Sequence, residues 1–401
     1  MTVTTAVSPW ARHSVEDSPA FQRPPRFADC TLRDGEQQPG VVFTRTQKVE
    51  IARSLAALGV HDLELGTPAV SSSDAEAIAD IVALDLGTYT SALGRATQSD
   101  VDLVNSCGVD AVRLSMPISR RQRAAKIDTD DNEYLRRALE ICDYAKQQDL
   151  DVIFSPYDTT RCELPLLEAL LKAFARDHSV DRVRLVDTTG AASPEAIRFL
   201  LRFMLEAGDG IPIEVHCHDD FGLATANTVA AALEGASYLS TTINGLGERA
   251  GNASLEEVAA ALEFLYGIDT GLNLESLPEV SDLVVRHSHV ALQPHKAVIG
   301  QNAFSHESGL VVSGLLRDPF TAQAYAPELV GRKRHIVVGK KSGRASIEAK
   351  LAELLPDAAA TTDIDAVLAD VKTRSIALER SLEDEEFVAI ATQHTKDTHE
   401  P

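Results

Sequence analysis

The fold is decided by a stretch that reads Arg182-Val183-Arg184-Leu185-Val186, then Pro194–Ala207, then Ile213-Glu214-Val215-His216-Cys217-His218. The two outer runs are short and rich in β-branched residues, whereas the apolar residues of the middle segment recur with the period of a helix. Ser193-Pro194 supplies an N-cap followed by a proline in the first turn. The order strand, helix, strand predicts a parallel pair joined by a crossover helix.

The same alternation extends in both directions from this stretch. Strands are predicted over Arg26–Leu32, His61–Leu65, Thr88–Ala92, Ala111–Met116, Asp151–Ser155, Arg182–Val186, Ile213–His218 and Tyr238–Asn244. Helices are predicted over Thr46–Leu58, Ser73–Leu84, Gln98–Ser106, Asn132–Gln148, Leu164–Ala175, Pro194–Ala207, Leu223–Glu234 and Ser254–Tyr266. Eight such units in roughly 240 residues predict an α/β fold, a (β/α)8 TIM barrel. An open doubly wound sheet is the alternative, which the even spacing disfavours.

The chain outside this rhythm divides into three further segments. Residues 1–24 are polar, contain three prolines and show no period, so we expect a disordered N-terminal arm. The barrel is expected over 25–285. Residues 286–345 predict a C-terminal lid or linker subdomain of loops and short helices. Residues 346–401 predict a small helical tail with two helical patterns and frayed final residues.

Composition excludes several classes of partner. Lys and Arg number 38 against 60 Asp and Glu, which gives a net charge of −22 and argues against nucleic acid or an anionic membrane surface. Apolar runs fall far short of the roughly 20 residues that cross a bilayer, and we find no signal peptide. Five scattered cysteines form no CxxC pair, which favours a cytoplasmic location.

Active sites of such barrels lie at the carboxyl ends of the strands. The first predicted strand ends in Thr31-Leu32-Arg33-Asp34-Gly35-Glu36-Gln37, and the seventh runs into His216-Cys217-His218-Asp219-Asp220. His216 and His218 are two residues apart and therefore share one face of the strand. Together with Asp34 they predict a divalent-metal site, with Asn252 after the eighth strand as a fourth ligand. A packed or capped histidine pair is the structural alternative.

Four motifs, in this order, resemble the DRE-TIM metallolyase superfamily. They are Thr31–Gln37, His216–Asp220, Gly247–Asn252 and Gly339–Arg344. The resemblance covers about residues 26–345 and is strongest to the homocitrate synthase and 2-isopropylmalate synthase family. The segment Pro327–Arg332 is most similar to the short bacterial homocitrate synthases.

The resemblance implies a Claisen condensation of acetyl-CoA with a 2-oxo acid, followed by hydrolysis to a 2-hydroxy di- or tricarboxylate and CoA. It implies a divalent metal, Mg²⁺, Mn²⁺, Zn²⁺ or Co²⁺, that polarises the acceptor carbonyl. Arg33 would stabilise the developing alkoxide, and Thr188 and Arg161 would contact the acceptor carboxylate. His306 would be the base or relay for the methyl proton. A homodimer is also implied.

Each of these roles has a structural alternative. Arg33 could neutralise Asp34 or Glu36, Thr188 could cap its strand, and His306 could be a surface residue. Reverse, lyase-type chemistry like that of hydroxymethylglutaryl-CoA lyase is a second functional class, and a non-catalytic barrel used for binding is a third.

Two positions depart from the family pattern. Tyr157 stands where the family has a glutamate, and the family tyrosine falls on Ala322, with Tyr325 three residues later as a candidate substitute. A pocket with one carboxylate fewer favours an anionic acceptor. The basic segment Ser119–Lys126 adds cations near the same mouth, although a solvated patch would read the same way.

These departures lead to a ranking of activities. The prediction is a homocitrate synthase-like acyltransferase that accepts an anionic 2-oxo acid such as 2-oxoglutarate or oxaloacetate. A 2-phosphonomethylmalate or 2-phosphinomethylmalate synthase is the first alternative, and 2-isopropylmalate synthase, with its apolar acceptor, is the second.

Overall fold

The computed structural model describes residues 5–396. The chain divides into two compact units, Ser8–Leu292 and a second that joins Met1–Val7 to Gln293–Pro401. The division lies near the predicted boundary at residue 285. Predictions for residues 1–4 and 397–401 fall outside the described residues.

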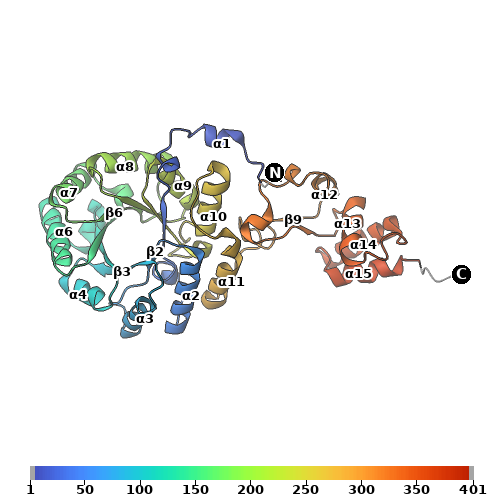
Figure 1. The fold of residues 1–401 in the computed structure, drawn as a ribbon, viewed down its shortest axis with the longest axis horizontal. Coiled ribbons are helices and arrows are strands. Elements are labelled where there is room, and N and C mark those ends of the chain that lie inside the picture. Colours follow the sequence, from blue (N-terminus) through green and yellow to red (C-terminus); the bar gives the residue numbers. More distant parts are fainter. Residues whose placement is uncertain (1–4, 397–401) are drawn as a thin grey trace. The chain divides into compact units, whose positions relative to one another are not determined.

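The first unit is a closed barrel of eight parallel strands in sequence order (Figure 1). Its strands are β1 Arg26–Asp29, β2 Asp62–Glu64, β3 Tyr89–Arg95, β4 Ala111–Pro117, β5 Asp151–Tyr157, β6 Arg182–Asp187, β7 Ile213–Cys217 and β8 Tyr238–Thr241. Strand β8 pairs with β1 and closes the ring. The predicted TIM barrel is therefore confirmed, and the open sheet is excluded.

Helices surround the ring of strands (Figure 1). They are α2 Arg45–Leu58, α3 Ser72–Val82, α4 Gln98–Ser106, α5 Arg120–Lys126, α6 Asp131–Lys146, α7 Leu164–Asp177, α8 Pro194–Ala207, α9 Ala224–Glu234, α10 Leu255–Ala260 and α11 Leu277–Ser288. The side chain of Ser193 accepts a hydrogen bond from the backbone of Ala196 and so caps α8 as the sequence predicts. Within the basic segment after β4, α5 is a helix that the periodicity did not predict.

Two strands end earlier than the sequence pattern suggests. Strand β1 stops at Asp29 because the backbone amides of Arg33, Asp34 and Gly35 all point back to the carbonyl of Cys30. This tight turn lifts Arg33 and Asp34 off the strand line and onto the rim of the barrel. Strand β8 similarly stops at Thr241, before the 3₁₀ turn η4 Ile243–Gly245.

Residues 8–24 differ from the predicted disordered arm. They contain α1 Pro9–His13 and the 3₁₀ turn η1 Pro19–Phe21. The hydroxyl of Ser18 donates to the carbonyl of Leu233 on α9, and Ala20 is buried. This part of the segment therefore packs against the barrel despite its polar composition.

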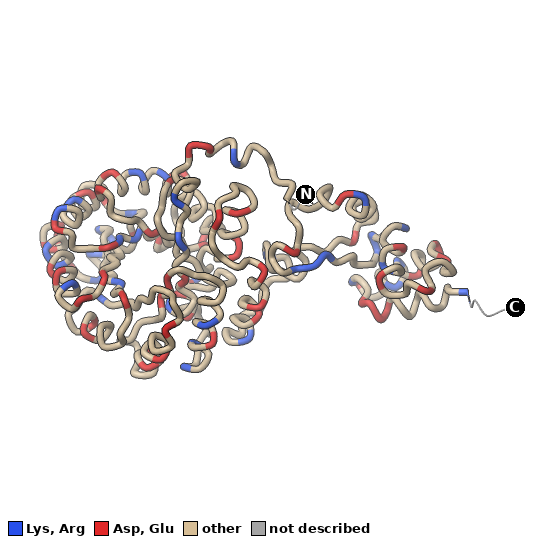
Figure 2. Tube along the Cα trace, viewed as in Figure 1, with Lys and Arg blue, Asp and Glu red and all other residues tan. Residues whose placement is uncertain are grey.

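The barrel interior holds a network of buried charges that the sequence analysis did not predict. Three guanidinium groups alternate with three carboxylates inside the barrel. Basic and acidic positions are both present along the tube of the barrel in Figure 2. The members are Arg113, Arg182, Arg184, Asp62, Glu64 and Glu214. Buried ions require partners, and here each cation contacts two or more carboxylates. The network holds Glu64 beneath the barrel mouth.

The second unit contains a small sheet and a helical bundle. Its elements are β9 Ser305–His306, α12 Gly309–Leu315, the 3₁₀ turns η7 Pro319–Thr321 and η8 Pro327–Val330, β10 His335–Ile336, α13 Arg344–Leu354, α14 Ile364–Leu378 and α15 Asp384–Gln393. Strands β9 and β10 are parallel. The bundle has three helices where the sequence suggested two, and its apolar core includes Leu351, Val371 and Phe387. Over residues 5–396, every helix is too short or too polar to span a bilayer.

Candidate active site

Asp34, His216 and His218 converge at the mouth of the barrel. The Asp34 Oδ2 atom lies 3.4 Å from His216 Nε2 and 3.9 Å from His218 Nε2, and the two Nε2 atoms are 3.3 Å apart. All three side chains are buried. They are a group of ligand-type atoms close enough to share one metal ion. The geometric premise of the sequence prediction is therefore met.

The two imidazoles are held neutral. Burial is the main reason that the pKa of His216 lies below its usual value. Burial, followed by the neighbouring His216, lowers the pKa of His218 to about 4. Strand register places Ser240 beside His216, and its hydroxyl is 2.9 Å from Nδ1. A neutral ring fixed through Nδ1 directs the Nε2 lone pair at the cluster, as a metal ligand must.

Burial opposes ionisation of Asp34, yet the cation beside it prevails. Arg33 and the two imidazoles hold the pKa of Asp34 well below its usual range. The Asp34 carboxylate is therefore charged near neutral pH. Two neutral nitrogens and one carboxylate make a mixed donor set for a divalent cation.

Asn252 joins the cluster through the loop after β8. Its Nδ2 donates to Asp34 Oδ1 at 3.1 Å and to the carbonyl of Leu246 at 2.9 Å. Its Oδ1 is buried and has no hydrogen-bond partner among the described residues. A Cβ added at Gly247 would lie 2.2 Å from Asn252 Nδ2, so only glycine lets Asn252 reach Asp34. Asn252 thus reaches Asp34 through its NH₂ group, and the same buried amide carries an oxygen that is left as a donor for a cation.

Arg33 is held between two carboxylates. Its Nη1 lies 2.6 Å from Asp34 Oδ2, and its Nε and Nη2 both donate to Glu64. Glu36, the other partner considered from sequence, instead pairs with Lys48. The Arg33 guanidinium is thus a nearly buried cation in fixed orientation beside the ligand cluster.

Thr188 and Arg161 meet at Asp158. The Asp158 backbone amide donates to Thr188 Oγ1 at 2.7 Å, and Arg161 pairs with the Asp158 carboxylate through Nε at 2.7 Å. Asp187 accepts hydrogen bonds from Thr160 and from two backbone amides, which makes it a structural residue. Asp158, in the loop after β5, therefore anchors both predicted acceptor-binding residues, although Thr188 itself directly follows β6.

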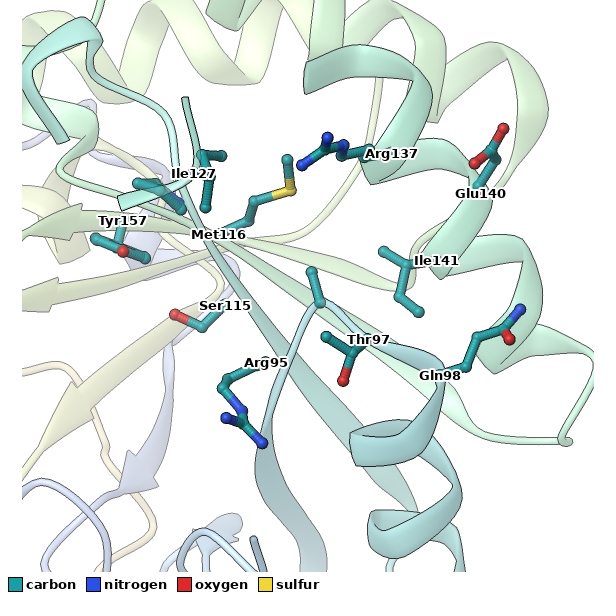
Figure 3. Close-up of a pocket in the computed structure, with 12 residues that line it drawn as sticks. Arg95, Thr97, Gln98, Ser115, Met116, Ile127, Arg137, Glu140, Ile141 and Tyr157 are labelled. Atoms are coloured by element: carbon teal, nitrogen blue, oxygen red, sulfur yellow. The ribbon is translucent and has the colours of Figure 1, made fainter. Parts of the chain in front are cut away.

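A cavity of about 580 Å³ opens between the ends of β3, β4 and β5 and helices α4 and α6 (Figure 3). Its wall is mixed, with apolar side chains at Met116, Ile127 and Ile141 and a hydroxyl at Ser115. Tyr157 lines the same cavity. The Nζ atom of Lys126 lies 4.8 Å from the centre of the Tyr157 ring, which is cation–π geometry.

The remaining predicted residues belong to the second unit and are described within it. His306 ends the short strand β9 and is partly buried. Tyr325 packs edge-on against Phe304 with 5.5 Å between ring centres, and burial raises the pKa of Tyr325 to about 12.

Sequence reasoning missed Glu64 and Ser240. A signal for Glu64 was present, because Asp62 and Glu64 alternate with leucines, as residues that share one face of a strand do. Nothing in the sequence indicated the role of Ser240, because its contact with His216 depends on the register between β7 and β8.

Two family models match the chain. The first, described as HMGL-like, matches residues 24–284. The second, described as homocitrate synthase post-HMGL domain-like, matches residues 298–381. The two matches correspond to the barrel and to much of the second unit.

Several named proteins are similar over most of the chain. A probable 2-isopropylmalate synthase of Ignicoccus hospitalis is 45% identical over 86% of this chain and 85% of its own length. A homocitrate synthase of Methanopyrus kandleri is 45% identical over 81% of this chain and 82% of its own. An (R)-citramalate synthase of Methanocaldococcus jannaschii is 43% identical over 81% of this chain and 66% of its own length.

Solved structures share the barrel. The crystal structure of a Bacillus subtilis HMG-CoA lyase has a TM-score of 0.59 and 21% identity, and covers 67% of this chain and 95% of its own. At that identity the likeness describes the fold alone.

Proposed function

Because the chain belongs to the homocitrate synthase and 2-isopropylmalate synthase family of the DRE-TIM metallolyases, we propose that it condenses acetyl-CoA with a 2-oxo acid and releases CoA. The observation that carries the proposal is the cluster of Asp34, His216 and His218 with Arg33 beside it. Relatives named for three different acceptors each match at least 81% of this chain, so they support the reaction class more than any one acceptor.

Asp34, His216 and His218 would hold a divalent metal, with Asn252 Oδ1 as the fourth donor. When bound, the metal supplies Lewis acidity that polarises the acceptor carbonyl. Mg²⁺, Mn²⁺, Zn²⁺ and Co²⁺ all suit two nitrogens and two oxygens.

Arg33 stabilises the negative charge that develops on the acceptor oxygen during carbon–carbon bond formation. Its guanidinium is pre-oriented by Glu64 and Asp34, so little reorganisation is needed when that charge forms. Thr188 and Arg161 bind the acceptor carboxylate from the β5–β6 side. His306 and Tyr325 contribute to proton transfer at the methyl group of acetyl-CoA.

The acceptor is an anionic 2-oxo acid, which makes the activity homocitrate synthase-like. Tyr157 provides a phenol where the family has a carboxylate, and Lys126 stands over its ring. Many of the other cations near this mouth are already paired, such as Arg95 with Asp100 and Arg137 with Glu133. Lys126 has no carboxylate partner in the described part of the chain, so its charge is available to a distal anionic group.

The departure at Tyr157 also supports a second candidate. A phosphonate or phosphinate acceptor carries its charge on a bulkier group, and the cavity of about 580 Å³ that Tyr157 lines would accommodate it. A 2-phosphonomethylmalate or 2-phosphinomethylmalate synthase is therefore the alternative.

One experiment separates these activities. Release of CoA thiol from acetyl-CoA is measured with 2-oxoglutarate, oxaloacetate, phosphonopyruvate, pyruvate and 2-oxoisovalerate. We expect the highest kcat/KM with one of the first three. Fastest turnover with 2-oxoisovalerate would overturn the anionic acceptor, and absence of thiol release with every acid, combined with cleavage of a 3-hydroxy-3-methylglutaryl thioester, would indicate the lyase direction.

Assembly and location complete the proposal. A homodimer is the expected state, and sedimentation of the purified chain tests it. All five cysteines lie in the described part and remain unpaired, which supports a reducing, cytoplasmic compartment.

A further inference from the structure

His306 lies beside a fixed amide within the second unit. Gln323, in the loop between η7 and η8, places its Nε2 3.5 Å from His306 Nε2. Gln323 is buried although it is polar. Its Oε1 receives two hydrogen bonds from Arg334, at 3.2 Å from Nε and 2.7 Å from Nη2. The three side chains form a chain in the order Arg334, Gln323, His306.

The orientation of the Gln323 amide follows from its partner. A guanidinium has only donors, so the group that faces Arg334 must be the amide oxygen. The NH₂ group of Gln323 is then forced to face His306. An amide NH₂ can only donate, so the imidazole Nε2 must be the acceptor and can carry no proton.

We propose that Gln323, locked by Arg334, is a positioning residue that holds His306 in the neutral tautomer with its proton on Nδ1. Protonation at Nε2 would bring an N–H against the NH₂ of Gln323, so the imidazolium form is disfavoured as well. The inference rests on the proposed function, because it assigns the direction in which His306 acts on the acetyl-CoA side.

The surroundings of His306 support the same state. Burial, followed by the charge of Arg334, which directly precedes β10, lowers the pKa of His306. The neighbouring carboxylate of Glu307 is engaged elsewhere, by the backbone amide of Lys341 and the hydroxyl of Ser381. The Nδ1 atom of His306 has no hydrogen-bond partner within residues 5–396, which leaves its N–H available to a substrate.

This tautomer restricts the chemistry. A neutral ring of this kind gives a proton or a hydrogen bond from Nδ1 and takes up a proton only at Nε2, once the amide moves away. In this state it therefore serves as a hydrogen-bond donor through Nδ1. Direct removal of the methyl proton by Nδ1 is ruled out in this state.

The test measures the protonation of the His306 imidazole by NMR. The chain is labelled with ¹⁵N-histidine, and His306 is identified by the signals that His306→Gln removes. We expect the nitrogen shifts of His306 to report an Nδ1–H tautomer near neutral pH. Gln323→Glu keeps the shape but presents an acceptor, so it should shift His306 to the Nε2–H tautomer or to imidazolium and raise its pKa by at least one unit.

Gln301→Glu is the matched control, because Gln301 is exposed in the same unit and the change adds the same charge. It should leave the His306 spectrum unchanged. An Nε2–H tautomer in the unaltered chain, or a Gln323→Glu spectrum identical to it, would overturn the inference. Thermal melting of each variant shows whether it is folded.

The two proposals fail separately in this design. The spectrum needs no turnover, so an Nδ1–H tautomer in a chain that releases no thiol with any 2-oxo acid would leave the positioning role in place and remove the proposed function. Normal thiol release together with an Nε2–H tautomer would support the proposed function and overturn the positioning role of Gln323.

Discussion

The guanidinium of Arg33 and the carboxylate of Glu64 meet as a two-point pair, with Nη2 3.3 Å from Oε2 and Nε donating to Oε1. Burial opposes the charge on Glu64, but Arg184 and Arg33 lower its pKa. Glu64 therefore connects Arg33 at the mouth of the barrel to the ion-pair network of its interior. The orientation of Arg33 depends on a residue that need not touch substrate.

We expect Glu64→Gln to impair both stability and turnover. The change leaves Arg33 and Arg184 with a neutral partner in a buried site, which costs about 3 kcal/mol in the free energy of unfolding. Urea denaturation measures that loss, and thiol release should fall at least about tenfold because Arg33 loses its fixed direction. Glu76→Gln, on an exposed ion pair with Arg45, is the control and should change neither quantity. Unaltered thiol release in Glu64→Gln would contradict the positioning of Arg33.

Removal of the charge on Asp34 tests the metal site. Asp34→Asn should reduce the metal content of the purified protein and lower thiol release at least about 100-fold, since the donor set loses its anion. Metal analysis and the thiol assay check both. Asp102→Asn, at an exposed hydrogen bond with Tyr144, should behave like the unaltered chain. If dialysis against EDTA left turnover intact, the assignment would be wrong.

The charge of the acceptor can be tested at Tyr157. Tyr157→Glu restores the family carboxylate and places an anion near the distal group of the acceptor. We expect kcat/KM for the best anionic acceptor to fall at least about tenfold relative to that for 2-oxoisovalerate. Tyr157→Phe keeps the ring under Lys126 and should preserve the preference. Equal effects of both variants on every acid would show that charge at this position does not select the acceptor.

Asp29 predicts a dependence of stability on pH. Burial raises the pKa of Asp29 to about 7 in the folded chain, against about 4 in an unfolded one. The folded state therefore holds the proton more tightly. The stabilisation is complete below pH 4 and is lost as the pH rises to 7, by up to about 4 kcal/mol.

Asp29→Asn keeps an acceptor oxygen for the backbone amide of Thr31, turns its NH₂ group toward the Thr31 hydroxyl oxygen, and cannot titrate. Urea denaturation from pH 4 to pH 8 gives the free energy of unfolding of this variant and of the unaltered chain. As the pH rises, we expect the variant to become more stable relative to the unaltered chain. A constant difference over that range would refute the raised pKa.

The helical bundle of the second unit should depend on Phe387. This side chain is fully buried among α13, α14 and α15, so Phe387→Ala should remove about 3–5 kcal/mol from the stability of the bundle. Hydrogen exchange should rise in these helices and not in the barrel strands. Ile376→Ala is the control, because Ile376 is 56% exposed on α14. Uniformly faster exchange along the whole chain would instead indicate that the two units unfold together.

The sequence by itself determined the barrel and the convergence of Asp34, His216 and His218. Eight strand–helix repeats admit one closed parallel arrangement, and the carboxyl ends of parallel strands meet at the same rim. Residues two apart on a strand share a face, so the pair at 216 and 218 was bound to point inward together. These inferences need only periodicity and chain direction.

The partners of those residues were decided only by the tertiary structure. Glu64 reaches Arg33, Ser240 reaches His216 and Gln323 reaches His306 across 31, 24 and 17 positions of the chain. The pairing of these buried polar groups depends on strand register, barrel closure and the turns of the loops. Those features arise when desolvated charges and amides must all be satisfied at once, and no local pattern records the outcome.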